Sequence, residues 1–216
     1  MIGSSSAKAV VGRVLTPTAR ALHRAGVTPD MVTIIGTLGV VGMSLGFLST
    51  GHFALGPWLV TIFIFSDTID GVLARLQGSS GPWGAFLDSS LDRFGDAAIF
   101  GSFVIWYAGG GDSRLISGVA LFVLAAGSIT SYLKARAEGL GLTANVGIAE
   151  RAERLIIGLV ACGLDGMLGV HWILPAGLWV LAVLTAVTVA QRFVVVWRQA
   201  RAPAAHSAAV PPARVP

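Results

Sequence analysis

The sequence predicts an all-α integral membrane protein with six transmembrane helices and an amphipathic surface helix at its N-terminus. Three observations support this prediction. Hydrophobic residues make up 54% of the chain and charged residues only 12%, about half the charged fraction of a soluble domain. Apolar segments of membrane-spanning length recur along the chain. The Lys and Arg residues are concentrated at the termini and in every second connection between these segments.

The six spans are read from two sets of apolar segments. An uncharged, mostly apolar run of about 18 residues or more can cross the ~30 Å hydrocarbon layer as a helix. Runs of this kind, with no charged residue, are 31–50, 115–133 and 173–190. Segments that are nearly as apolar but carry ionisable residues toward one end are 53–75, 84–108 and 151–171. A soluble helical bundle is the alternative, but it would leave several helices apolar on every face.

The two ends of the chain differ from this central part. Residues 7–25 mix Val, Leu and Ala with basic residues, which predicts a helix that lies on the membrane surface among anionic headgroups. The last residues, 202–216, are rich in Pro and Ala and are expected to be disordered. We therefore divide the chain into a cytoplasmic N-terminal segment (1–29), a six-helix domain (30–201) and a cytoplasmic tail (202–216).

The distribution of Lys and Arg predicts the orientation. With six spans, the connections near 51–57, 109–114 and 164–172 lie on one side and contain a single basic residue, Arg114. The other 14 of the 15 Lys and Arg residues lie in or beside the termini and the remaining connections. Cytoplasmic connections are the ones enriched in Lys and Arg, so we expect a multi-pass protein of the cell membrane with both termini in the cytoplasm. The net charge of +4 fits this topology, and nothing in it calls for nucleic acid.

Four aspartates are the main candidates for function. Asp67 and Asp70 are three residues apart and Asp88 and Asp92 four apart, so each pair shares one face of a helix. An aspartate at the centre of a membrane helix costs about 2.5–3.5 kcal/mol on insertion scales. Bound divalent cations remove that cost, and all-oxygen ligands favour Mg²⁺ or Mn²⁺. The same positive-inside argument places this site on the cytoplasmic side.

Small residues beside the aspartates indicate room for a substrate. Gly71, Ala74 and Gly84 would let a flat ring or a pyrophosphate approach the helix backbones. Arg75 is expected to neutralise phosphate oxygens, since its guanidinium can contact two of them at once.

This stretch resembles the signature of the CDP-alcohol phosphotransferase family, D-x2-D-G-x2-A-R-x8-G-x3-D-x3-D. Every element and spacing is present in the chain, as Asp67, Asp70, Gly71, Ala74, Arg75, Gly84, Asp88 and Asp92. The resemblance extends to the six-span plan and covers the chain except its ends. It also implies a homodimer.

The resemblance implies a role for each site residue. Asp67 and Asp88 would bridge two ions of Mg²⁺ or Mn²⁺, Asp70 would complete one site and Asp92 the other. Asp92 would also be the catalytic general base on the acceptor hydroxyl. The residues that would bind CDP-diacylglycerol are Asp30, Met31, Val32, Thr33, Gly71, Ala74, Arg75, Ser80, Gly81 and Gly84.

The implied reaction moves a phosphatidyl group from CDP-diacylglycerol to an alcohol and releases CMP. As a whole the chain is similar to family members whose acceptor is inositol phosphate, which gives phosphatidylinositol phosphate as the product. Phosphatidylglycerophosphate synthase, with glycerol 3-phosphate as its acceptor, is the alternative within the family. A cation-coupled transporter also uses carboxylates inside the membrane, but it needs a pathway between both faces, and the ionisable residues here cluster on one side.

A second cluster is basic and lies near the ends of the later spans. Lys134, Arg154 and Arg192, with Arg151 and Arg136 as weaker candidates, are predicted to bind the phosphate of the acceptor. The alternative is that they set topology and form local ion pairs such as Glu150–Arg154. This cluster cannot separate inositol phosphate from glycerol phosphate, because both carry a phosphate.

Three other residues are weaker candidates for a role in function. His171 and Asp165 are expected at the opposite membrane face, His171 as an interface anchor and Asp165 as a solvated loop residue. Asp96 lies one turn beyond Asp92 and is expected either to support the site residues or to pair helices.

Overall fold

The computed structural model describes residues 16–78 and 81–201, and every element in these ranges is a helix. The predicted start of the surface helix before residue 16 and the predicted tail 202–216 lie outside the described residues. After a helical segment at 16–24, the helices are α2 (Pro29–Met43) with a π-helical extension η1 (Ser44–Leu48), α3 (Gly56–Ile64), α4 (Ser66–Gln77), α5 (Pro82–Ala108), α6 (Arg114–Glu138), α7 (Arg151–Leu168) and α8 (Ile173–Arg201).

Capping residues explain where several helices begin. Thr28 precedes α2, and its hydroxyl accepts a hydrogen bond from the Met31 amide, which satisfies a free donor of the first turn. Pro29 follows as the first helical residue, a position where its missing N–H costs nothing. Pro82 opens α5 in the same way, after an extended Gly81.

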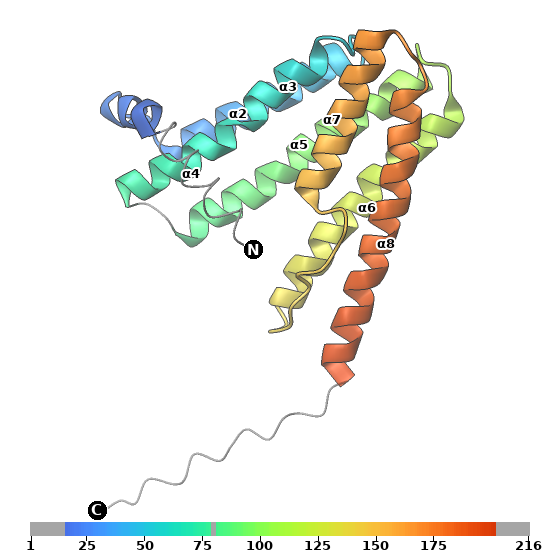
Figure 1. Cartoon of the computed structure of the whole chain (residues 1–216). Coiled ribbons are helices and arrows are strands. Elements are labelled where there is room, and N and C mark those ends of the chain that lie inside the picture. Colours follow the sequence, from blue (N-terminus) through green and yellow to red (C-terminus); the bar gives the residue numbers. More distant parts are fainter. Residues whose placement is uncertain (1–15, 79–80, 202–216) are drawn as a thin grey trace, which may run out of the picture.

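The helices pack into one bundle in which α5 is central (Figure 1). It contacts α2 on one side and α6 on the other, while α8 packs against both α6 and α7. The core is formed by large apolar side chains such as Phe100 and Phe103 of α5, whose rings meet edge to face with centroids 6.1 Å apart. This core occupies the second half of α5. The first half, which carries Asp88 and Asp92, borders the cavities described below.

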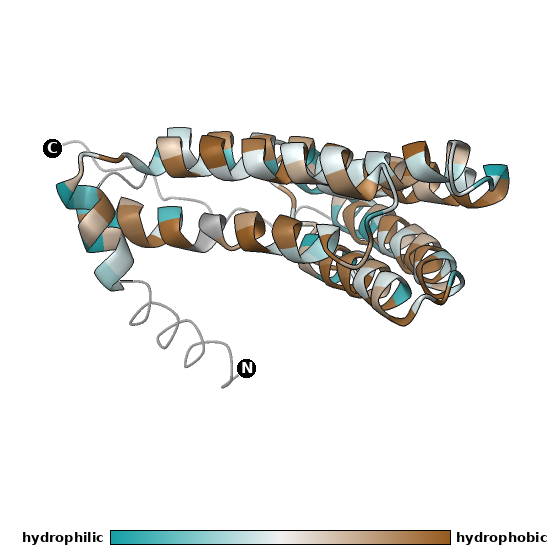
Figure 2. Cartoon of the chain, turned by 90° about the horizontal axis from the view of Figure 1, so that it is seen from above, coloured by the Kyte–Doolittle hydropathy of each residue, from teal (hydrophilic) through white to brown (hydrophobic). Residues whose placement is uncertain are grey.

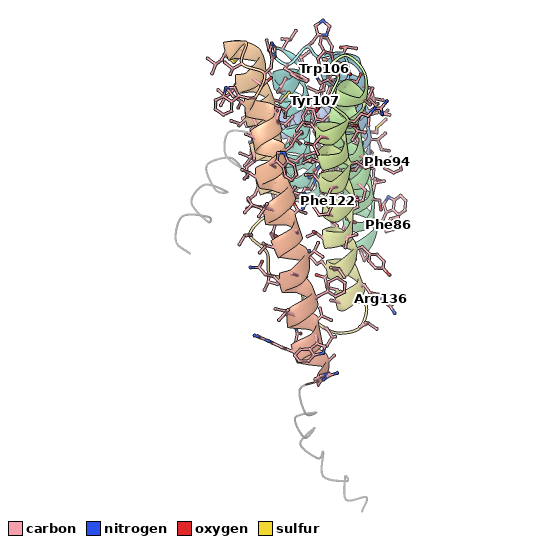
Figure 3. All side chains as sticks on the ribbon, turned by 90° about the vertical axis from the view of Figure 1, so that its right-hand side faces the viewer. Phe86, Phe94, Trp106, Tyr107, Phe122 and Arg136 are labelled. Carbon is pink, nitrogen blue, oxygen red and sulfur yellow. The ribbon has the colours of Figure 1, made fainter. Side chains whose placement is uncertain are left out.

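The outer faces of the helices are apolar. Figure 2 shows hydrophobic residues along the visible surfaces of the bundle, and large side chains such as Leu38, Ile62 and Phe94 are exposed. In Figure 3 Phe86 and Phe94 project away from the bundle. In water such surfaces would be unfavourable, whereas hydrocarbon chains can cover them.

Three helical segments in the described part of the chain are long and apolar enough to cross a membrane: Pro29–Leu48, Arg114–Glu138 and Ile173–Arg201. The other three predicted spans differ from these for visible reasons. The second is divided at Phe65 into the short helices α3 and α4. The third and fifth, in α5 and α7, carry the charged residues of the candidate site. Six spans therefore remain a prediction.

The helical segment 16–24 lies against α4. Ala19 is fully buried in a small cluster with Val72 and Leu73, and Gln77 donates a hydrogen bond to the Val27 carbonyl at 3.0 Å. This part of the predicted surface helix thus packs on the helix that carries Asp67 and Asp70.

Candidate active site

The four aspartates lie on two helices that both pack against α2. Asp67 is in the first turn of α4, and its side chain is outside the described residues. Asp70, one turn later, is only 8% exposed and accepts a 2.6 Å hydrogen bond from the Thr33 hydroxyl. Asp88 and Asp92 follow one another on consecutive turns of α5, with Asp88 exposed. The backbone places Asp67 and Asp70 one turn apart on α4, and Asp88 and Asp92 one turn apart on α5.

A first cavity, of about 630 Å³, lies between α2, α4 and the start of α5. We call it the α4 cavity. It brings together most of the residues predicted to bind the donor, along with two of the aspartates. Its lining residues are Thr28, Pro29, Asp30, Thr33, Asp70, Gly71, Ala74, Arg75, Gln77, Gly81, Pro82, Trp83, Gly84, Ala85 and Asp88.

The glycines of the α4 cavity leave the space that the sequence suggested. A Cβ atom added at Gly71 or Gly84 would meet no atom within 4 Å, so a ligand could reach the helix backbones there. Across the mouth, Trp83 Nε1 donates to Asp30 Oδ2 at 2.9 Å, which joins the start of α5 to the start of α2. Trp83 has no counterpart among the predicted site residues.

Among the described residues, two of the predicted donor contacts do not line this cavity. Met31 is 52% exposed on the outer side of α2, and Val32 packs against the cluster of Ala19 and Leu73. Both are adjacent to lining residues in sequence, but a helix turns successive side chains to different faces. Ser80 lies outside the described residues.

A second cavity, of about 840 Å³, lies on the other side of α5 and is bordered by α6, α7 and α8. We call it the α6 cavity. The two cavities meet at Ala85, which lines both. The lining residues are Ala85, Ser89, Ser90, Asp92, Arg93, Ser128, Thr130, Ser131, Tyr132, Lys134, Ala135, Glu138, Glu150, Arg151, Arg154 and Arg192.

The α6 cavity gathers four of the five predicted acceptor-binding cations, Lys134, Arg151, Arg154 and Arg192. The fifth, Arg136, is exposed and does not line it. Figure 3 shows Arg136 near the far end of α6. The reason is helical geometry, since two residues of separation turn Arg136 by about 200° from the face of Lys134.

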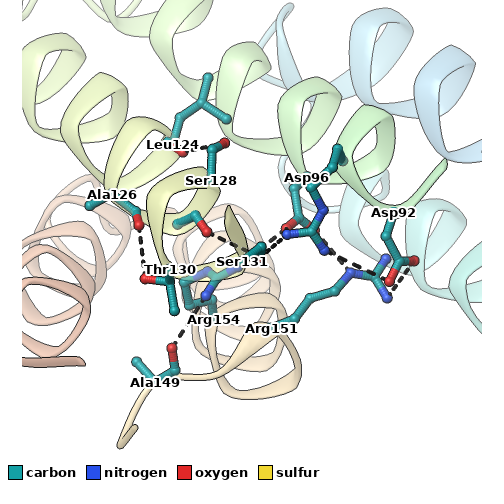
Figure 4. Close-up of polar contacts among 12 residues, drawn as sticks. Asp92, Asp96, Leu124, Ala126, Ser128, Thr130, Ser131, Ala149, Arg151 and Arg154 are labelled. Carbon is teal, nitrogen blue, oxygen red and sulfur yellow. Dashed lines mark hydrogen bonds and ion pairs between the residues drawn. The ribbon is translucent and has the colours of Figure 1, made fainter. Parts of the chain in front are cut away.

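An ion-pair network connects Asp92 and Asp96 of α5 to α7 (Figure 4). Arg151 Nη1 lies 2.8 Å from Asp92 Oδ1, and its Nε donates to Asp96 Oδ1 at 3.1 Å. Arg154, only 1% exposed, donates from Nη2 to Asp96 Oδ2 at 3.2 Å and from Nη1 to the Ala149 carbonyl at 3.3 Å. Asp96 therefore pairs helices, as expected, and also fixes two of the predicted phosphate-binding cations.

The local ion pair between Glu150 and Arg154, given above as part of the alternative role of the basic cluster, is not formed among the described residues. Glu150 instead pairs with Arg192, with Nη2 to Oε1 at 3.1 Å, because Arg154 turns inward to Asp96. Arg192 is 3% exposed and also donates to the carbonyls of Val146 and Thr130. It thereby attaches the connection between α6 and α7 to α8. Both basic residues have a structural role besides any contact with a ligand.

Apart from Lys134, the polar residues of α6 that line this cavity were missed by the sequence reasoning, although a signal existed. Ser128, Ser131, Lys134 and Glu138 recur at intervals of three or four residues, which places them on one face of a helix. In the structure that face lines the α6 cavity. Arg93 of α5 donates to the Ser131 hydroxyl and so connects the two faces.

The donor atoms suit a hard divalent cation. Asp70 and Asp88 line one cavity and Asp92 the other, all presenting carboxylate oxygens of the kind that Mg²⁺ and Mn²⁺ prefer. Among the described side chains, which leave out Asp67, no three His, Cys, Asp or Glu residues converge closely enough to form a metal site by themselves. The described carboxylates therefore fit a hard divalent cation that takes its remaining ligands from outside this set.

The chain matches a family model and several known proteins. Residues 26–188 match the family model of the CDP-alcohol phosphatidyltransferases. The phosphatidylinositol phosphate synthase of Streptomyces avermitilis is 49% identical over 209 residues, which cover 94% of this chain and 86% of the relative. The enzyme of the same name from Cutibacterium acnes is 50% identical over 193 residues, covering 86% of this chain and 93% of the relative.

Solved structures of a related enzyme have the same fold. The crystal structure of Mycobacterium tuberculosis phosphatidylinositol phosphate synthase with CDP-DAG bound superposes with a TM-score of 0.83 at 39% identity, over 86% of this chain and 94% of that one. A second structure of that enzyme, in complex with manganese and citrate, gives a TM-score of 0.82 at 39% identity, over 85% and 88% of the two chains.

Proposed function

We propose that this chain, which belongs to the CDP-alcohol phosphatidyltransferase family, transfers the phosphatidyl group of CDP-diacylglycerol to a hydroxyl of inositol phosphate. The products are phosphatidylinositol phosphate and CMP. Relatives that match most of the chain at about half of all positions carry the corresponding name. The observation that supports the proposal best is the position of α5, which presents Asp88 to one cavity and Asp92 to a basic cavity that meets the first at Ala85.

The α4 cavity is the proposed site of the CDP group. Arg75 would contact phosphate oxygens, while the open faces of Gly71 and Gly84 accommodate the nucleotide close to the backbone. Asp30, Thr33, Ala74 and Gly81 also line this cavity, and Met31, Val32 and Ser80 remain proposals from the family resemblance alone. A related enzyme whose structure contains CDP-DAG has the same fold, which supports the assignment of the donor.

The proposed metal ligands are Asp67, Asp70, Asp88 and Asp92. Together they would bind two ions of Mg²⁺ or Mn²⁺ per active site. Divalent metal dependence agrees with the manganese complex of the related enzyme. When bound, such ions neutralise charge on the attacking and leaving oxygens of a phosphoryl transfer. The contribution of the chain is to hold the carboxylates on two rigid helices, with Asp70 fixed by Thr33.

The α6 cavity is the proposed site of the acceptor. Lys134, Arg151, Arg154 and Arg192 surround it with positive charge, which suits a phosphorylated alcohol. Asp92 would accept the proton of the attacking hydroxyl, since an alcohol is a weak nucleophile and a carboxylate within hydrogen-bond reach assists its attack. Arg136 is a proposal from sequence alone, because it is remote from the cavity lining.

The membrane arrangement follows the sequence predictions. We propose six spans within residues 30–201, preceded by a surface helix in 1–29 and followed by the tail 202–216. The cell membrane, cytoplasmic termini and a cytoplasmic active site are proposed from the one-sided distribution of basic residues. A homodimer is proposed from the family resemblance, and the molar mass of the detergent-solubilised protein would test it.

CMP release measures the proposed reaction directly. Purified enzyme with CDP-diacylglycerol should release CMP when inositol phosphate is added, and much less with glycerol 3-phosphate, free inositol or serine. A clear preference for glycerol 3-phosphate would keep the site but change the acceptor, and so contradict the proposal. Absence of CMP release with every acceptor would exclude the transferase activity and favour the alternative of a cation-coupled transporter.

A further inference from the structure

The end of the bundle opposite the aspartates contains a third cavity, which we call the distal cavity. It has a volume of about 440 Å³ and lies where the connections after η1 and after α5 meet the end of α7. Its wall includes Tyr107, which is 19 residues after Asp88 on α5, or about 28 Å along a helix. Figure 3 shows Trp106 and Tyr107 at the end of the molecule away from Arg136. The distal cavity is therefore separate from both cavities of the candidate active site.

A buried carboxylate lines the distal cavity. Asp165 was expected in a solvated loop, but this is wrong: it lies in α7 and is only 2% exposed. Its Oδ1 accepts a hydrogen bond from the Leu174 amide at 3.1 Å, and within the described residues no Lys, Arg or His forms an ion pair with it. A carboxylate removed from water without a counter-ion is strongly unfavourable. A bound cation would remove this penalty.

Three aromatic side chains contribute to the walls, beside several glycines and two histidines. Phe53, Trp106 and Tyr107 line the distal cavity, and the rings of Phe53 and Trp106 meet edge to face with centroids 5.5 Å apart. Aromatic faces attract organic cations at distances of up to about 6 Å. The volume is far larger than a single metal ion requires, and the described side chains contain no cluster of three His, Cys, Asp or Glu that could hold one. These features favour an organic ammonium group over an inorganic ion.

We propose that the distal cavity binds an organic ammonium group, with Asp165 as its counter-ion and Trp106 as an aromatic wall. In the membrane orientation proposed above, this cavity lies at the level of the outer headgroups. His171, another lining residue, is followed by an exposed Trp172, a residue type enriched at membrane interfaces. The ammonium could therefore belong to an ethanolamine lipid headgroup or to a free amine, and both present the same chemistry.

Two measurements on the purified full-length protein test this proposal and separate the two sources. Ethanolamine hydrochloride should raise the unfolding midpoint in a saturable way, beyond the effect of NaCl at equal ionic strength. Native mass spectrometry should show preferential retention of phosphatidylethanolamine over phosphatidylglycerol with the same acyl chains. Saturable stabilisation by the free amine without lipid retention identifies a soluble ligand, and retention of the lipid identifies the headgroup. Equal effects of NaCl and ethanolamine together with equal retention of both lipids would overturn the proposal.

Single substitutions test whether the ammonium group binds in the distal cavity. Asp165→Asn should weaken ammonium binding about tenfold or more, because a charged hydrogen bond is lost, while Asn can still accept from the Leu174 amide. Asp112→Asn is the matched control, since Asp112 is exposed in the turn before α6 and is not among the residues that line the cavity. Should Asp165→Asn fail to fold, Trp106→Leu should weaken binding about 2- to 30-fold through loss of the aromatic face. Unchanged binding in the folded variants would refute the assignment.

Discussion

Arg151 Nη1 lies 2.8 Å from Oδ1 of Asp92, so the proposed general base is held by a cation that comes from α7. The same guanidinium reaches Asp96 through Nε at 3.1 Å. One planar group thus spans two carboxylates on consecutive turns of α5. Because a guanidinium presents several donors in a fixed plane, this arrangement restricts the orientation of the Asp92 carboxylate at the edge of the α6 cavity.

Arg151→Lys should separate orientation from charge. Lysine keeps the positive charge but is a single flexible donor group that does not reproduce the planar bridge. We expect kcat to fall about tenfold or more, with the loss of a charged hydrogen bond of ~1.5–3 kcal/mol, while the KM for CDP-diacylglycerol stays nearly constant. Arg114→Lys, at the exposed opposite end, is the control. A rise in acceptor KM at normal kcat would instead make Arg151 a substrate contact.

Asp92→Asn tests the base itself. The amide keeps the shape of the side chain but does not accept a proton, so turnover should fall by about 100-fold or more. Binding of CDP-diacylglycerol should be largely retained, because the α4 cavity contains other residues for it. Measuring both kcat and donor affinity, with Asp112→Asn as a neutral reference, distinguishes the base from a group needed mainly for binding. Near-normal turnover would remove Asp92 from this role.

Removal of divalent metal should abolish the reaction. Purified enzyme in excess EDTA is expected to release no CMP, and added Mg²⁺ or Mn²⁺ should restore release, because clustered carboxylates on α4 and α5 need cations to bring a pyrophosphate close. Asp67→Asn should weaken both metal and donor binding, which equilibrium measurements would detect independently of turnover. Full turnover in EDTA would contradict the assignment of metal ligands.

The sequence alone predicted how the aspartates are spaced along α4 and α5. The intervals between Asp67 and Asp92 are short, and helical periodicity is enough to place each aspartate pair on one face. Contacts between distant segments could not be predicted in this way. Asp96 and Arg154 are 58 residues apart, and only the folded structure shows that they pair with each other.

The burial of residues at the helix ends could not be predicted from the sequence either. Asp165 follows an apolar stretch and resembles a loop residue, but the connection after η1 packs onto the end of α7. A Cβ atom at the neighbouring Gly166 would lie only 2.2 Å from the Ala54 amide nitrogen and 2.3 Å from the Phe53 carbonyl carbon. Glycine permits this close approach, and hydropathy carries no information about which segment covers which.

Gly127→Ala, a substitution on α6, should displace the guanidinium of Arg154. A Cβ atom at Gly127 of α6 would lie 3.0 Å from Arg154 Nε and 3.2 Å from its Cζ, closer than ordinary contact. The guanidinium must then shift, and the acceptor KM should rise up to about tenfold if one charged hydrogen bond is weakened. Gly118→Ala on the same helix is the matched control, since a Cβ atom there meets nothing within 4 Å. Equal acceptor KM values in the two variants would show that Arg154 does not contact the acceptor.

The division of the site into two cavities gives the sharpest prediction for the basic residues. Arg154→Ala and Arg192→Ala should each raise the KM for inositol phosphate about 10- to 150-fold, which corresponds to one charge-assisted contact of ~1.5–3 kcal/mol. The KM for CDP-diacylglycerol should barely change, because Arg75 and the aspartates are the proposed donor-binding residues. Arg136→Ala removes the same charge outside the α6 cavity and should alter neither value.

Arg192 needs one additional measurement, because it donates to the carbonyls of Val146 and Thr130 as well as to Glu150. Arg192→Ala removes the side-chain donor to the buried Thr130 carbonyl and to the partly buried Val146 carbonyl. The unfolding midpoint of this variant should therefore fall, whereas Arg192→Lys should recover part of the stability. If acceptor KM follows stability across these variants, Arg192 acts by holding the connection between α6 and α7. If Arg192→Lys restores the midpoint but not the acceptor KM, the guanidinium itself contacts the phosphate. A rise in donor KM with unchanged acceptor KM, in either Arg154→Ala or Arg192→Ala, would show that the two cavities have been assigned to the wrong substrates.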